Sequence, residues 1–169
     1  MVFIKIIILI GILISCVCIG NSISKRFISR VNDLIDMKKA LNILETKIKF
    51  TYEPLPQVFL YISKNVNDSI SQIFKNSAKK MEKESAGSAW KDALEKDKTN
   101  LKQEDLEILK SLGNLLGKTD IDGQVSEIEL VNRMLDVQIN KAEEDKTKYV
   151  KMYRSLGIYI GLAIIVVLI

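Results

Sequence analysis

Two uncharged apolar runs, one near each end, constrain the fold of this 169-residue chain more than any other feature. The first covers 15 residues, from Ile6 to Gly20, and the second covers 14 residues, from Leu156 to Ile169. As helices they would measure roughly 21 to 23 Å, and neighbouring apolar residues lengthen each toward the ~30 Å hydrocarbon core of a bilayer. A core helix of a soluble protein is the alternative. We predict transmembrane helices over residues 1–20 and 156–169.

The basic residues that flank the two runs predict the orientation of the chain, because Lys and Arg near membrane spans are retained on the cytoplasmic side. They gather on the inner side of both runs, at Lys25, Arg26, Arg30, Lys38 and Lys39 and at Lys146, Lys148, Lys151 and Arg154. The sequence therefore predicts a membrane hairpin with residues 21–155 in the cytoplasm and both ends outside.

The basic excess of the chain comes from these flanks. Between them the chain carries 15 Lys and Arg against 18 Asp and Glu, so the central region is mildly acidic. A nucleic-acid surface requires the opposite balance. We therefore expect protein partners and no nucleic acid.

The residues Leu13-Ile14-Ser15-Cys16 also fit the box at which bacterial lipoproteins are cleaved and lipidated. Against this interpretation, apolar residues continue to Ile19 and are followed by basic residues that oppose export. A membrane-anchored helical lipoprotein facing outside stays the alternative. In both cases Cys16 and Cys18 lie in one apolar helix without a partner cysteine, which predicts neither a disulfide nor a metal pair.

Between the apolar runs the periodicity is helical, and no stretch alternates like a strand for long. No Gly or Pro interrupts residues 21–50, so the first span is expected to continue as a helix for about 30 residues. Pro54 and Pro56 end it, because the residue before a proline avoids the helical region and proline donates no helix bond. Pro56 suits the first turn of the next helix, and Asn67 or Asp68 caps the one after.

Two more short helices are expected before the last long one. Gly87-Ser88 is predicted to break the chain before a helix around Trp90, which we interpret as a core anchor. The next helix starts near Leu101 and is closed by Gly117.

Residues 118–129, KTDIDGQVSEIE, match most of the twelve-residue pattern of a calcium loop. Lys118, however, stands at the first ligand position, and an apolar stripe at helical spacing begins at Ile121. Both features favour a helix start, capped by Thr119 or Asp120, over a metal site.

The last helix meets no Gly or Pro between Gln124 and Leu156, so it is expected to pass directly into the second span. The predicted fold is all-α. It is a six-helix cytoplasmic bundle over residues 21–155, flanked by an N-terminal and a C-terminal transmembrane helix, with the two long helices continuous with the spans.

The composition argues against catalysis. The chain has no histidine, no glycine-rich phosphate loop and no serine in a nucleophile turn. Adjacent acidic pairs such as Glu104 with Asp105 do not face each other on a helix and are expected to be solvated. We expect no enzyme activity, no cofactor, no metal and no small-molecule substrate.

Several motifs follow one another along the chain in one order. They are Leu41-Asn-Ile-Leu-Glu-Thr-Lys-Ile-Lys-Phe-Thr-Tyr-Glu-Pro-Leu-Pro56, then Ser88-Ala-Trp90 with Ala93-Leu94, then Leu112-Gly-Asn-Leu-Leu-Gly117 with Asp120 and Gln124. Together with the final KYVKMYRSLGIYIGLAIIVVLI they resemble the stage III sporulation protein AB family of endospore-forming bacteria. The resemblance covers nearly the whole chain, although Phe50 stands where that family usually has tyrosine.

The resemblance implies a non-enzymatic membrane component of the channel that joins mother cell and forespore, located in the bacterial cell membrane with its central domain on the mother-cell side. The cytoplasmic domain is similar to that of the type II secretion platform protein F. By this analogy the partners are the sporulation ATPase of the same complex and other membrane subunits of the channel. A homo-oligomer is also compatible with this interpretation.

Eight residues that match the family pattern are candidate site residues. For the three polar ones, contact with a partner and internal capping or bridging are equally compatible with the sequence: Glu45, Asp120 and Gln124. The others are expected to serve turn geometry and close packing: Pro54, Pro56, Trp90, Gly113 and Gly117.

Overall fold

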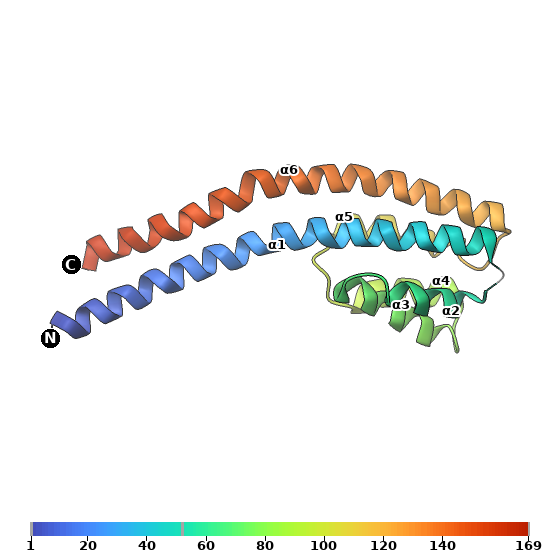
Figure 1. Ribbon diagram of the computed structural model, residues 1–169, viewed down its shortest axis with the longest axis horizontal. Helices are drawn as coiled ribbons and strands as arrows, with labels where there is room; N and C mark the ends of the chain where they lie inside the picture. Colours follow the sequence, from blue (N-terminus) through green and yellow to red (C-terminus); the bar gives the residue numbers. More distant parts are fainter. Residues whose placement is uncertain (1, 52, 169) are drawn as a thin grey trace. The chain divides into compact units, whose positions relative to one another are not determined.

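The computed structural model describes residues 2–51 and 53–168, and within these residues it contains six helices and no strand (Figure 1). The helices are α1 (Val2–Phe50), α2 (Leu55–Ser63), α3 (Asp68–Lys80), α4 (Ala86–Lys96), α5 (Gln103–Leu112) and α6 (Ile121–Leu168). The predicted all-α fold is therefore confirmed, and each of the two long helices is continuous with an apolar end. The chain divides into two compact units, a terminal unit of residues 1–31 with 141–169 and a central unit of residues 32–140.

Helices α1 and α6 are each long and apolar enough to cross a membrane, judged by length and composition. Their apolar windows have mean hydropathies of 2.3 and 1.6, and 11% of each window is buried. The core helix of a soluble protein would bury most of such a window, so the low burial supports a membrane protein. The span boundaries at residues 20 and 156 and the side of the membrane stay predictions.

In the terminal unit, α1 and α6 run antiparallel and come into close contact at glycines. A Cβ atom on Gly20 would lie 2.6 Å from the carbonyl oxygen of Tyr153, and one on Gly157 would lie 2.8 Å from the carbonyl oxygen of Cys16. Small residues allow such close backbone approach between helices in a membrane, where van der Waals packing replaces the hydrophobic effect as the driving force.

Polar and aromatic contacts join the same two helices in the part of the terminal unit that follows Gly20. The Phe27 ring stacks on Tyr149 and Tyr153, with centroids 5.3 and 5.9 Å apart. Arg30 pairs with Asp145 across 3.5 Å, and the Arg30 side chain is almost fully buried. The pairing of residues 27 and 30 with 149 and 145 continues the antiparallel register of the glycines.

The four short helices of the central unit pack around three aromatic side chains. Phe59, Phe74 and Trp90 are fully buried, and their ring centroids lie 5.0 to 5.8 Å apart. Trp90 Nε1 donates a 2.7 Å hydrogen bond to the carbonyl oxygen of Leu109. This bond satisfies the one polar group of the indole and joins α4 to α5.

Proline and asparagine begin two of these helices where the sequence indicates. Pro54 is the residue before α2, and Pro56 lies in its first turn. Asn67 caps α3, because its Oδ1 accepts a 2.9 Å hydrogen bond from the backbone nitrogen of Ile70. Of the two candidates for that cap, Asn67 is therefore the one used.

The chain break predicted at Gly87-Ser88 is wrong. Helix α4 already begins at Ala86, and Ser85 is its cap, with Oγ accepting from the backbone nitrogen of Ser88 at 3.3 Å. Gly87 is buried in the first turn of the helix, where its lack of a side chain permits close packing and does not interrupt the chain.

Helix α5 is shorter than predicted. It ends at Leu112, Gly113 is its C-cap, and residues 113–119 form turns. Leu116 is nevertheless buried, so its spacing reports a core contact and not another helical turn. Asp105 also differs from expectation, because it is buried and accepts a 2.8 Å hydrogen bond from the backbone nitrogen of Lys102 at the start of α5.

Candidate functional site

The connection between α5 and α6 holds two of the three polar residues that match the family pattern. We call residues 113–124 the tip. Gln124 fixes its conformation, because Oε1 accepts a 3.0 Å hydrogen bond from the backbone nitrogen of Gly117 and Nε2 donates one of 3.0 Å to the carbonyl oxygen of Thr119. One side chain thus satisfies a donor and an acceptor of a turn that lacks regular secondary structure.

Gly117 adopts a left-handed backbone conformation within the tip. Its φ of 72° lies in the left-handed region, which residues with a Cβ atom adopt at a cost. A Cβ atom here would also lie 3.3 Å from side-chain carbons of Leu55 and Ala86. The glycine is therefore explained by backbone geometry and by packing against α2 and α4.

Asp120 caps α6. Its Oδ1 accepts hydrogen bonds from the backbone nitrogen of Gly123 at 3.0 Å and from the Thr119 hydroxyl at 3.1 Å. A carboxylate at this position satisfies an amide that has no partner within the helix and faces the positive end of the helix dipole. Since α6 starts at Ile121, the segment that resembles a calcium loop is the beginning of a helix.

No group of three or more His, Cys, Asp and Glu side chains in the described part of the chain is placed to hold a metal ion. The carboxylate of Asp122 is exposed and makes no hydrogen bond or ion pair with the residues described. Both oxygens of Asp122 are therefore available to a partner, whereas one oxygen of Asp120 is already used in capping α6.

The surface of the tip is both apolar and acidic. Leu115 and Ile121 are 38% and 40% exposed, beside the exposed carboxylates of Asp120 and Asp122. Lys118 is the only basic residue of the segment. A fixed turn that presents apolar and charged side chains together is suited to contact with another protein.

Glu45 lies apart from the other two candidate interface residues. In the central unit α1 and α6 are antiparallel, with Asn132 Nδ2 donating a 2.9 Å hydrogen bond to Asn42 Oδ1. This register places Glu45 level with residue 129, nine residues beyond Asp120, or about 13 Å along the helix. The structure brings Asp120 and Gln124 together and leaves Glu45 outside the tip.

A buried carboxylate that sequence reasoning missed organises the other side of the central unit. Asp33 on α1 accepts four hydrogen bonds of 2.9 to 3.2 Å, from the side chains of Asn67 and Ser69 and from both the backbone and side-chain nitrogens of Asn100. The neighbouring Asp36 accepts a fifth, from the backbone nitrogen of Asn67 at 3.2 Å. These bonds hold the α2–α3 and α4–α5 connections against α1.

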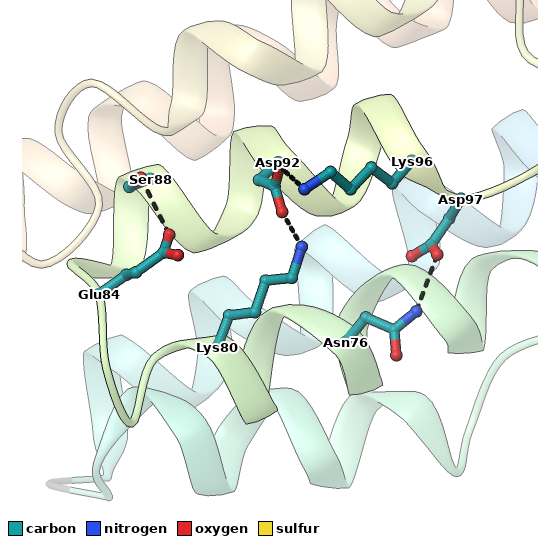
Figure 2. A network of polar contacts seen from close by, with 7 residues as sticks. All are labelled: Asn76, Lys80, Glu84, Ser88, Asp92, Lys96 and Asp97. Atoms are coloured by element: carbon teal, nitrogen blue, oxygen red, sulfur yellow. Dashed lines mark hydrogen bonds and ion pairs between the residues drawn. The ribbon is translucent and has the colours of Figure 1, made fainter.

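Helices α3 and α4 are joined by a chain of surface contacts (Figure 2). Lys80 on α3 pairs with Asp92 on α4, which also pairs with Lys96 at 2.6 Å. Asn76 donates a 2.8 Å hydrogen bond to Asp97 at the end of α4. These side chains point toward one another, and the contacts between Lys80 and Asp92 and between Asn76 and Asp97 bridge the two helices.

Comparison with known proteins identifies the chain. The sequence model of the stage III sporulation protein AB family matches residues 5–169. The chain belongs to this family. A stage III sporulation protein AB from Bacillus subtilis (strain 168) is 31% identical over 153 residues, which are 88% of this chain and 90% of that protein.

A solved structure of stage III sporulation protein AB has the same fold. It superposes with a TM-score of 0.67 at 27% identity, over 71% of this chain and 98% of that structure. The family resemblance carried by the motifs is therefore confirmed, and the chain is a sporulation protein.

In this member of the stage III sporulation protein AB family the motifs occupy two places. The described residues of the motif from Leu41 to Pro56 lie at the end of α1 and the start of α2, and the motif from Leu112 to Gln124 covers the last residue of α5 and the tip. Asp120 and Gln124 have internal roles as cap and bridge, and contact with a partner remains a prediction for them and for Glu45.

Proposed function

We propose that this chain is a non-enzymatic platform subunit of the complex that connects mother cell and forespore during endospore formation. In this proposal α1 and α6 anchor it in the cell membrane and the central unit lies in the cytoplasm. The tip contacts the ATPase of the same complex, and other faces contact membrane subunits of the channel. The observation that carries the proposal is the tip, a braced turn with exposed apolar and carboxylate side chains.

Further features of the chain support this role. The family is one of sporulation proteins, two helices are apolar enough to span a membrane, and the basic flanks favour a cytoplasmic central unit. The composition, without histidine or a phosphate-binding glycine loop, supports a role without catalysis. The similarity to the platform protein of type II secretion that the family resemblance implies supports the coupling of an ATPase to membrane subunits.

Contact between the tip and the ATPase is tested by co-purification of the two full-length proteins in detergent. Asp122→Lys reverses an exposed charge that pairs with no described side chain, so it should reduce recovery of the ATPase about tenfold. Because Asp122 lies in the first turn of α6, the reversal should also cost up to about 1 kcal/mol in stability, which melting of the same preparation measures. The matched control is Glu82→Lys, the same charge reversal at an exposed position between α3 and α4. Equal recovery with Asp122→Lys and with the control would show that the tip is not the contact, and no recovery with the unaltered chain would contradict ATPase binding.

The side of the membrane is tested separately with a single cysteine at Ser88, which is exposed in the central unit. Cys16 and Cys18 are replaced by alanine, and intact cells are treated with a membrane-impermeant thiol reagent. Ser88→Cys should stay unlabelled until the cells are lysed. Labelling in intact cells would contradict the platform proposal and favour the lipoprotein facing outside.

A further inference from the structure

An open groove follows the surface of α1 in the central unit, and none of its lining residues belongs to the tip. It is lined by α1 residues between Ile35 and Lys47 and by Tyr61 of α2. The side chains of Ile35 and Tyr61 are 45% and 47% exposed, and that of Ile43 is half-buried. These side chains give the groove an apolar floor, and an apolar surface with a polar rim is typical of a protein interaction site.

The rim of the groove is basic. Lys38, Lys39 and Lys47 line it, and none of its lining residues is acidic. Lys38 pairs with Asp136, and Lys47 pairs with Glu53 at 2.7 Å, both outside the lining. Exposed pairs of this kind contribute little to stability, so a carboxylate from a partner competes with them at low cost.

Lys39 differs from the other two lysines. Its Nζ donates a 2.7 Å hydrogen bond to the carbonyl oxygen of Asn65, and in the part of the chain that the structure describes it pairs with no carboxylate. Lys64, which precedes Asn65, is exposed and also pairs with no carboxylate in the described part of the chain. The groove therefore has positive charge that the chain itself does not neutralise.

The length of the groove and the chemistry of its lining indicate which kind of polypeptide segment can bind there. From Ile35 to Lys47 the helix rises about 18 Å, the length of a helix of about 12 residues. The backbone groups of α1 are used within the helix, so no free edge exists to which an extended peptide could add as a strand. An amphipathic helix lays an apolar face into such a groove and places charged residues along its edges.

We propose that the α1 groove binds an amphipathic helix of a second protein, with its apolar face on Ile35, Ile43 and Tyr61 and an acidic residue paired with Lys39. This inference goes beyond the proposed contact of the tip with the ATPase and does not depend on it. It gives the central unit two separate binding surfaces, of which the groove prefers an acidic partner.

The test uses two fluorescent peptides of about 14 residues with the same leucines at helical spacing. One carries glutamates beside the apolar face, and the other carries lysines at the same positions. Binding to the full chain in a neutral detergent is followed by fluorescence anisotropy. The acidic peptide should bind at least tenfold more tightly than the basic one, and added salt should weaken its binding.

Two variants and two matched controls assign the binding to the groove. Ile35→Asp should weaken binding of the acidic peptide at least tenfold. Val137→Asp, an equivalent change at an exposed position of α6, should leave this affinity unchanged. Lys39→Glu should weaken binding of the acidic peptide and strengthen binding of the basic one. Lys75→Glu, at an exposed position of α3, should change neither affinity. Asp122→Lys in the tip should leave both affinities unchanged, which separates this proposal from the proposed function.

Several outcomes would overturn the proposal. The first is a failure of specificity, seen as equal binding of the two peptides or as equal effects of each variant and its control. A second is displacement of the acidic peptide by phosphatidylglycerol added to the micelles, which would assign the groove to lipid headgroups. The third is a concentration-dependent oligomer of the full chain in sedimentation that Ile35→Asp dissociates, which would assign the groove to a second copy.

Discussion

A Cβ atom on Gly87 would lie 1.9 Å from the carbonyl oxygen of Gly113, so the first turn of α4 and the end of α5 are in backbone contact. The reverse contact is less severe, because a Cβ atom on Gly113 would lie 2.9 Å from the Gly87 oxygen and otherwise meet the flexible side chain of Lys91. The two glycines therefore have unequal roles, and Gly87 is the one whose small size the packing requires.

Gly87→Ala should lower the stability of the central unit by about 2 to 3 kcal/mol, because α4 and α5 must separate to admit the methyl group. Gly113→Ala should cost less, about 1 to 2 kcal/mol, because Lys91 can move and the Gly87 oxygen has to shift by a smaller distance. Ser88→Ala, one position along the same helical turn and exposed, should stay within about 0.5 kcal/mol. Thermal unfolding of the full chain in detergent, followed by circular dichroism, compares the stabilities of the three variants. Equal melting of the Gly87 and Ser88 variants would contradict the close contact.

Asp33 carries a second prediction, because its carboxylate has only donors around it. Asp33→Asn introduces a donor that faces the amide of Asn100, so even this isosteric change should cost about 2 to 4 kcal/mol. Asp68→Asn, at an exposed position in the first turn of α3, is the matched control and should cost less than about 1 kcal/mol. Unfolding in detergent compares them, and a stable Asp33→Asn protein would show that the four bonds contribute little.

The features that sequence reasoning predicted are those set by neighbouring residues. The apolar spacing of the long helices, the turn at Pro54 and Pro56 and the cap of α6 all depend on residues within a turn or two of each other. These local rules locate the starts of α2, α3, α5 and α6 to within a few residues, and the break predicted at Gly87 misplaces the start of α4.

The features that were missed depend on residues far apart in the chain. Asp33 lies 67 residues from Asn100, and no spacing rule connects a carboxylate on a helix to an amide in a later turn. Leu116 has the spacing of a helical residue because it is buried, while the chain around it has already turned at Gly113. Burial and periodicity are correlated, and only the packed structure separates them.

The crossing of α1 and α6 in the terminal unit leads to a prediction of disulfide formation. A Cβ atom on Gly161 would lie 3.4 Å from Cβ of Cys16, close to the separation in natural disulfides. Gly161→Cys should therefore cross-link to Cys16 within one chain when a membrane-permeant oxidant is added, in a protein where Cys18 is replaced by alanine. The mobility of the chain on a denaturing gel, with and without reductant, measures the bond.

Ala163→Cys is the control for this cross-link, because two residues along a helix turn the side chain to the opposite face and the Ala163 position is exposed. It should give no intramolecular bond with Cys16. Cross-linking of both positions to the same extent would mean that the two helices do not cross at Gly157 and Gly161. Cross-linking only between separate chains would place Cys16 against a second copy.

Asp120 separates a structural role from a functional one, because asparagine caps helices about as well as aspartate but carries no charge. Asp120→Asn should keep the melting temperature of the full chain and still reduce recovery of the ATPase, if the tip is the contact we propose. Asp120→Ala removes the acceptor for Gly123 and should cost about 1 kcal/mol in stability as well. Melting and co-purification are measured on the same preparations. Normal recovery with Asp120→Asn, together with early melting of Asp120→Ala, would leave Asp120 as a cap alone and limit the contact to Asp122 and the exposed leucine and isoleucine of the tip.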